Sequence, residues 1–257
     1  MTALDELGLT VPIFSDKHLS YRIDETVWMY EQLKARGIPF MGGSSIPHTP
    51  YVPPFDTGKL AEAKEILVVS YSTAVEAYGY HALEVLQSVA EKRAGGETGV
   101  RAVYALEGEA VWEAMDRGEW PEDLMLEALA VMREGAPAHP RECGDPAWLF
   151  VVEYADGTKG YVIQQNQLTD QWRFAVRTGS GEIVATICES ELDRPFGHFE
   201  TLTRLIERFI ITGVEPFPME RVLMSSGLTN YAMDALHRHA VVETPALNRQ
   251  YGLTTSA

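Results

Sequence analysis

The sequence contains only two cysteines in 257 residues, Cys143 and Cys188. They lack Cys-x-x-Cys spacing, so the sequence offers no zinc pattern and favours two reduced thiols in a cytosolic protein. No apolar run is long enough to cross a bilayer. The first ten residues show no basic segment followed by an apolar one, as a signal peptide would. We therefore expect a cytoplasmic protein.

Basic residues are also scarce: 21 Lys and Arg stand against 37 Asp and Glu, which gives a formal net charge of -16. This balance argues against nonspecific binding to nucleic acid or to an anionic membrane. It does not exclude an acidic substrate, because a single site can be locally basic. The His237-Arg238-His239 run is not a metal pattern, since adjacent positions on a helix do not face each other.

Two catalytic signatures are missing. The sequence has no Gly-x-Ser-x-Gly, the turn that presents a nucleophilic serine. It also has no Gly-x-Gly-x-x-Gly, the turn that lets a backbone approach the pyrophosphate of a dinucleotide at a helix N-terminus. The residues before position 17 are too few to hold a full nucleotide-binding domain of five or six strands.

What the sequence does contain is an α+β pattern. A strand at about 9–14, a helix at about 24–36 that Gly37 ends, and a strand at 38–41 form a βαβ unit, so these two strands should be parallel. A proline-rich crossover over 44–58 follows. Behind it we expect a mostly antiparallel, open-faced sheet with helices on one side. Its strands lie at 65–71, 101–106, 148–154, 159–165, 172–177 and 182–187, and its helices at 80–93, 121–133, 198–212 and 219–236.

The segment 11–20 resembles part of the glucose–fructose oxidoreductase and inositol dehydrogenase family, often written Gfo/Idh/MocA. In that family a strand near the end of the nucleotide domain is followed by Glu-Lys-Pro, a helix and another strand. The lysine of this motif contacts substrate and acts in catalysis. Lys17 matches that lysine, whereas Asp16 replaces the glutamate and His18 the proline.

The segment 79–84 supplies a second match. Family members often show Asp-x-Gly-x-His followed by Leu-Asp, entering a helix, and the histidine commonly transfers the proton. Gly79, His81 and Glu84 match this motif, whereas Ala77 stands where the aspartate is expected. The two motifs occur in the family's order, and the resemblance covers nearly the whole chain.

The resemblance implies a domain organisation and a function. Residues 1–45 correspond to the last βαβ part of a Rossmann domain, and residues 46–257 to the sheet domain that binds substrate and forms oligomers. It implies an NAD(P)-dependent oxidoreductase acting on a hydroxyl of a sugar, glycoside or cyclitol. It also implies NAD or NADP as cofactor and a homo-oligomer formed through the open sheet face. Most of the nucleotide half is missing here, so a separate nucleotide-binding chain is one possible partner.

The candidate site follows from these matches. Lys17 and His81 are the candidate catalytic residues, because a lysine can polarise a hydroxyl oxygen and a histidine can take its proton near neutral pH. The candidate substrate-binding residues are Glu76, Tyr80, Arg173 and His198. Each has a plainer alternative as a surface, capping or core residue.

Two other functions stay open. The chain could be a noncatalytic sugar-binding or assembly module that retains the family's C-terminal domain. It could also be a cofactor-free sugar isomerase or lyase that uses Lys17 and His81.

Overall fold

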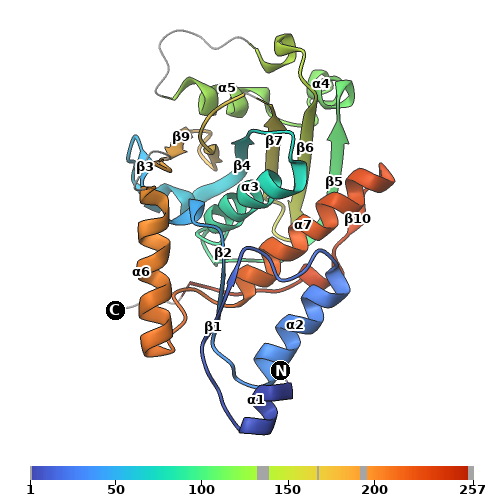
Figure 1. The fold of residues 1–257 in the computed structure, drawn as a ribbon. Helices are drawn as coiled ribbons and strands as arrows, with labels where there is room; N and C mark the ends of the chain where they lie inside the picture. Colours follow the sequence, from blue (N-terminus) through green and yellow to red (C-terminus); the bar gives the residue numbers. More distant parts are fainter. Residues whose placement is uncertain (1, 132–138, 167, 192–195, 254–257) are drawn as a thin grey trace.

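Two β-sheets organise the computed structural model, which describes residues 2–131, 139–166, 168–191 and 196–253 (Figure 1). The α-helices of these residues are α1 (Thr2–Leu7), α2 (Ile23–Ala35), α3 (Val75–Ala90), α4 (Glu109–Asp116), α5 (Glu122–Ala130), α6 (Gly197–Thr212) and α7 (Glu220–Arg238). The strands are β1 (Ile13–Asp16), β2 (Phe40–Gly43), β3 (Tyr51–Val52), β4 (Ala63–Ser70), β5 (Val100–Glu107), β6 (Ala147–Tyr154), β7 (Lys159–Gln165), β8 (Arg173–Thr178), β9 (Ile183–Cys188) and β10 (Val242–Glu243).

The small sheet pairs β1 with β2 in parallel, with Ile13 opposite Phe40, and α2 connects the two strands. This confirms the predicted βαβ unit. Strand β1 begins at Ile13, four residues later than predicted, because the preceding residues follow α1: the N–H of Leu9 donates to the carbonyl of Leu4. Strand β1 ends at Asp16, so the polar residues that follow lie directly at its carboxyl end.

The large sheet has the strand order β10-β5-β6-β7-β4-β8-β9-β3. Its neighbouring strands are antiparallel except β4 and β7, which are parallel. The predicted hairpin is β6–β7, where Gly157 has φ 86° and the Asp156 carboxylate accepts the N–H of Thr158 at 2.9 Å. The α+β class is thus confirmed. No helix among the described residues is both long and apolar enough to cross a membrane.

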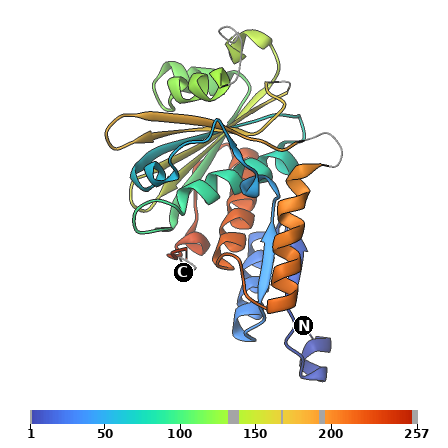
Figure 2. The ribbon, with the colours of Figure 1, turned by 90° about the vertical axis from the view of Figure 1, so that its left-hand side faces the viewer.

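Helices cover both faces of the large sheet, which corrects the expectation of helices on one side. Helices α3 and α7 pack on one face, whereas α4 and α5 pack on the other (Figure 2). On α5 the buried positions Leu124, Met125, Ala128 and Leu129 form a helical stripe that faces the sheet. Helices α4 and α5 pack on part of the face on which the sequence predicts an oligomer contact, and that contact stays a prediction.

The small sheet shares a hydrophobic core with the C-terminal helices. Tyr30 and Leu33 of α2, Phe209 of α6 and Val222 of α7 belong to one buried cluster. The predicted boundary near residue 45 separates the two sheets, but this core extends across it. Helix α7 consequently contacts both sheets and lies between them (Figure 1).

Candidate active site

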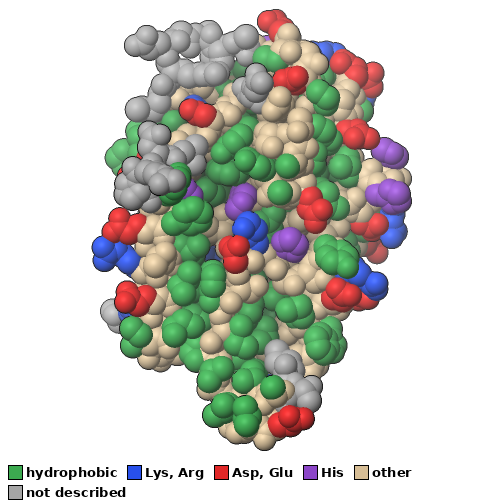
Figure 3. All heavy atoms as spheres, viewed as in Figure 1, with side chains coloured by type: hydrophobic (Ala, Val, Ile, Leu, Met, Phe, Trp, Pro, Cys, Tyr) green, Lys and Arg blue, Asp and Glu red, His purple; other side chains and the backbone are tan. Residues whose placement is uncertain are grey.

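A cavity of about 340 Å³ lies at the carboxyl end of β1, where the parallel sheet meets the beginning of α3. Its lining residues are Lys17, His18, Ala74, Val75, Glu76, Ala77 and Tyr80. Ligands of α/β proteins bind beyond the carboxyl ends of parallel strands, so this is the expected place for a site. Figure 3 shows basic, acidic and histidine side chains gathered near the centre of this face, among hydrophobic side chains.

Lys17 is held in an unusual backbone conformation at the mouth of the cavity. Its φ of 68° lies in the left-handed region, which is unfavourable for a residue with a side chain. Two contacts hold the segment: Lys17 forms a β-bridge with Gly43, and the N–H of Leu19 donates to Ser226 Oγ at 3.0 Å. The ammonium group contacts the exposed Asp16 carboxylate, at 2.8 Å. Such a surface pair contributes little energy, so the ammonium group can turn to a ligand.

His81 lies in the second turn of α3, beside the cavity. Its ring centroid is 5.8 Å from that of Tyr80, and its Nδ1 is 2.7 Å from Ser44 Oγ. Ser44 Oγ also accepts the N–H of Ile46 at 3.1 Å, which fixes the hydroxyl oxygen. When Nδ1–H donates to Ser44, Nε2 is free to accept a proton; when the hydroxyl donates to Nδ1, Nε2 is protonated. The pair therefore suits both directions of a proton transfer.

Electrostatics keep His81 neutral. The pKa of His81 is lowered from 6.5 to about 4: burial is the largest cause and the positive charge of Lys17 the next, while Asp16 acts in the opposite direction and His198 lowers the pKa slightly. Lys17 and His198 thus lie close enough to His81 to act on its pKa, although the three residues come from separate parts of the chain. A neutral imidazole at neutral pH can accept a proton from a bound hydroxyl.

The other predicted residues divide into two groups. Tyr80 and the exposed Glu76 line the cavity, and His198, at the start of α6, acts on His81 through its charge. Arg173 does not join them. Its guanidinium donates to the carbonyl of Val131 at 2.7 Å and to Thr169 Oγ1 at 2.8 Å, next to the end of α5. The prediction for Arg173 is therefore corrected, because its side chain lies on the sheet face opposite α3.

Aromatic side chains form a wall on another side of His81. Trp172 lies 5.2 Å from the His81 ring and stacks on Tyr78 at 5.6 Å. Tyr71 contacts Tyr78 at 5.0 Å and Trp172 at 4.8 Å. Aromatic faces next to a histidine suit the apolar face of a carbohydrate ring.

The sequence predicts no role for Ser44, and for Glu84 it shows only a match to the family motif. Glu84 is fully buried on α3 and accepts the N–H of Ser44 at 2.9 Å. The available signal was weak: Ser44 directly follows the glycine pair that ends β2, a place where ligand-contacting loops begin. Its contact with His81 joins residues 37 positions apart, which a local pattern does not reveal.

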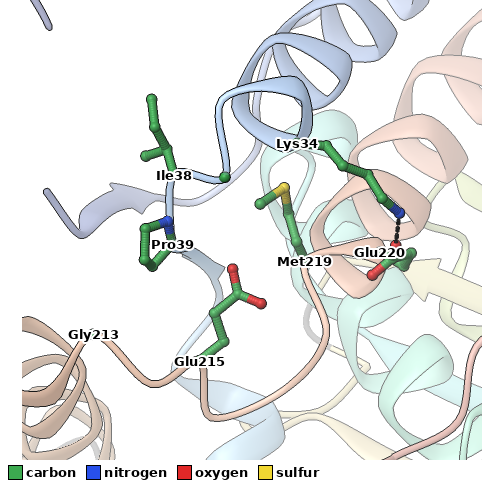
Figure 4. A pocket seen from close by; sticks show the side chains of 8 residues that line it. Lys34, Ile38, Pro39, Gly213, Glu215, Met219 and Glu220 are labelled. Atoms are coloured by element: carbon green, nitrogen blue, oxygen red, sulfur yellow. Dashed lines mark hydrogen bonds and ion pairs between the residues drawn. The ribbon is translucent and has the colours of Figure 1, made fainter. Parts of the chain in front are cut away.

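A second cavity, of about 380 Å³, lies at the opposite end of the small sheet, where Ile38 and Pro39 precede β2 (Figure 4). Lys34 is bound there to Glu220 at 2.5 Å, and Glu215 accepts the N–H of Phe40 at 2.8 Å. Its polar groups therefore bind one another. This cavity lies at the amino end of β2, has no histidine among its lining residues, and its Lys34 and Glu220 are paired with each other, so we assign the site to the cavity beside His81.

The described residues do not fit a whole dinucleotide. The turn from β1 to α2, residues 17–22, contains no glycine, so its backbone offers no close approach for a pyrophosphate. The small sheet has only two strands in the described part of the chain. In those same residues no group of three or more His, Cys, Asp or Glu side chains is placed to hold a metal ion.

Comparisons with known proteins find structural relatives only. No family model matches the chain, and no curated protein sequence does. Among solved structures, GenD2 from gentamicin A biosynthesis, in complex with NAD, matches 94% of this chain and 73% of its own, with a TM-score of 0.60 and 14% identity. The myo-inositol dehydrogenase of Corynebacterium glutamicum matches 94% and 75%, with a TM-score of 0.58 and 12% identity.

A third relative, the scyllo-inositol dehydrogenase of Lactobacillus casei with bound NAD(H) and scyllo-inositol, matches 90% of this chain and 72% of its own. Its TM-score is 0.55 at 11% identity. At such identities the likeness shows the fold. The resemblance stated from the sequence is confirmed at that level: the chain has the fold of the glucose–fructose oxidoreductase and inositol dehydrogenase family.

Proposed function

We propose that this chain is the substrate-binding and proton-transferring part of an NAD(P)-dependent oxidoreductase that acts on a hydroxyl of a sugar or cyclitol. The observation that supports this most directly is the proximity of Lys17 and His81: Lys17 lines the cavity directly after β1, and His81 of α3 lies beside it, in contact with the cavity-lining Tyr80 and within reach of the charge of Lys17. Structural relatives whose names state an inositol dehydrogenase activity support the substrate class. The groups that bind the nucleotide come from outside these 257 residues.

The chain's own residues account for the proton side of the reaction. Lys17 places its ammonium group against the substrate oxygen and favours the developing negative charge. His81 Nε2 takes the hydroxyl proton, while Ser44 holds Nδ1 at 2.7 Å and so fixes the direction of Nε2. In the reverse direction the same nitrogen returns the proton. NAD or NADP, when bound, accepts the hydride.

The test needs the complete assembly, with its nucleotide-binding part. His81→Gln should lower kcat by a factor of about 10² to 10⁴, the usual contribution of a general acid–base residue, and change KM little. Lys17→Met should lower kcat and raise KM together, since Lys17 contacts the substrate in both states. Full turnover by His81→Gln would refute the proposal.

The noncatalytic alternative is supported by one observation: Ala77 stands at the cavity wall where the family motif has an aspartate. Titration of this chain with cyclitols and sugars, followed by calorimetry, tests for substrate binding, and an assay of hydride transfer then separates the two. Both functions give sugar binding, but only the enzymatic one gives hydride transfer once the nucleotide-binding part is added. Proton exchange into a bound sugar without any nucleotide would indicate the cofactor-free isomerase or lyase instead.

A further inference from the structure

A fully buried carboxyl group lies directly behind the candidate site. Glu84 is 1% exposed and sits on α3, one turn after His81. Its Oε2 accepts the N–H of Ser44 at 2.9 Å. A Cβ on Gly43 would lie 2.6 Å from the same oxygen, so only glycine fits at the end of β2 while Glu84 is in place.

Glu84, Ser44 and His81 form a closed ring of contacts. Ser44 is held through its N–H by Glu84 and through its hydroxyl by His81, and both of these residues belong to α3. The end of β2 is thereby fastened to one helix at two points. The position of Ser44 Oγ, and with it the direction of the His81 ring, depends on where the carboxyl group lies.

Keeping a carboxyl group at this depth is costly. Burial raises the pKa of Glu84, and the nearby Ser225 hydroxyl and the N–H of Ser44 offset part of that rise. An apolar side chain of similar size would avoid this cost but would leave the N–H of Ser44 buried and unpaired. The carboxyl group is therefore suited to one task, which is to hold the main chain at Ser44.

We infer that Glu84 is a positioning residue that sets the orientation and tautomer of His81 by holding Ser44. The importance of this for catalysis rests on the proposed function. The geometric claim itself concerns only this chain and can be tested without substrate.

The test compares two replacements of Glu84 by ¹⁵N NMR of the His81 ring at pH 7. Glu84→Gln retains an oxygen that accepts the N–H of Ser44, so the ring nitrogen signals should stay as in the parent protein. Glu84→Leu removes the oxygen that accepts the N–H of Ser44. The ratio of the two His81 tautomers should then change about fivefold, which corresponds to about 1 kcal/mol for one hydrogen bond.

A double-mutant cycle tests whether the effect passes through Ser44. Ser44→Ala should change the tautomer ratio as Glu84→Leu does, and the double variant should show no further change. Additive effects, or an unchanged ratio in folded Glu84→Leu, would overturn the inference. Glu97→Leu is the matched control: Glu97 is also 1% exposed and accepts a backbone N–H, that of Gly99 at 2.7 Å, but it does not contact Ser44 or His81.

If Glu84→Leu does not fold, Glu84→Met replaces it in the test. Its unbranched side chain is close in length to that of glutamate but offers no oxygen to the N–H of Ser44, so it should give the same change at His81, and an unchanged ratio would again overturn the inference. The two proposals fail separately. Full turnover by His81→Gln would refute the proposed function and leave the coupling of Glu84 to His81 intact, whereas independent behaviour of Glu84 and Ser44 would refute only the positioning role.

Discussion

Removing the positive charge of Lys17 should raise the pKa of His81. That pKa is about 4, against 6.5 for an ordinary histidine, with burial as the largest cause and the charge of Lys17 as the next. The difference of about 2.5 corresponds to about 3.4 kcal/mol, at about 1.36 kcal/mol per pKa unit. Lys17→Met removes the second cause and leaves the first, so the pKa of His81 should settle between 4 and 6.5.

The neighbouring residue provides the matched control. Asp16 raises the pKa of His81, so Asp16→Asn should lower that pKa further. Both replaced side chains are at least half exposed, and neither belongs to the hydrophobic core. The two variants should therefore fold equally well and shift the pKa of His81 in opposite directions.

The measurement is an NMR titration of the histidine ring protons and nitrogens between pH 3 and 8, with the His81 signals assigned from His81→Gln. An unchanged pKa near 4 in Lys17→Met would mean that the ammonium group does not act on the imidazole. Shifts of both variants in the same direction would have the same meaning. Either result would remove the main support for a shared site.

Two further predictions concern stability and ligand binding. Because the pKa of His81 in the folded protein lies below 6.5, the stability that its neutral form provides is complete above pH 6.5 and is lost as the pH falls toward 4. The free energy of unfolding, measured with urea, should therefore fall by about 3 kcal/mol less in His81→Gln than in the parent protein over that pH range. Equal decreases in the two proteins would contradict the depressed pKa. Arg173→Met should cost about 2 kcal/mol of stability, because the hydrogen bonds of a buried charge to Thr169, Val131 and Asp170 are lost, but leave ligand binding beside His81 unchanged in calorimetry. Weakened ligand binding without a loss of stability would indicate that Arg173 belongs to the binding site.

The sequence predicts the large sheet well because its signals are local. The Asp156-Gly157 turn and the apolar runs on either side define β6 and β7, and the strand bounds agree with the structure. The start of α3 was predicted five residues too late, since Ala74 provides no capping side chain. The early start matters, because it brings Val75, Glu76 and Ala77, which line the cavity, into the helix.

The site itself was predicted only as far as motifs reach. Lys17 and His81 were identified because they match positions of family motifs. Ser44 contacts His81 across 37 positions, and no local sequence pattern predicts such a contact. Arg173 was predicted to bind substrate, but side chains alternate along a strand with a period of two residues, and its own points away from His81. Phe174 packs in the core beside α3, so position 173 has to point the other way, and Trp172 has the parity that faces His81.

Helix α7 has a composition that is unusual for a core helix, and the site explains it. Ser225, Ser226, Thr229 and Asn230 are all buried on it, although polar residues in a helix interior are costly when unpaired. Ser225 and Thr229 donate to main-chain carbonyls of α7 itself, whereas Ser226 and Asn230 contact the loop that follows β1. Ser226 Oγ accepts the N–H of Leu19 across 207 positions, and Asn230 donates to the carbonyl of Ser20 at 2.9 Å. The loop that carries Lys17 is thus fixed by side chains from the far end of the chain.

Helix α7 also places Ser225 against Glu84. Since both arms of the site are held from α7, the spacing of Lys17 and His81 depends on this helix more than on the two-stranded sheet.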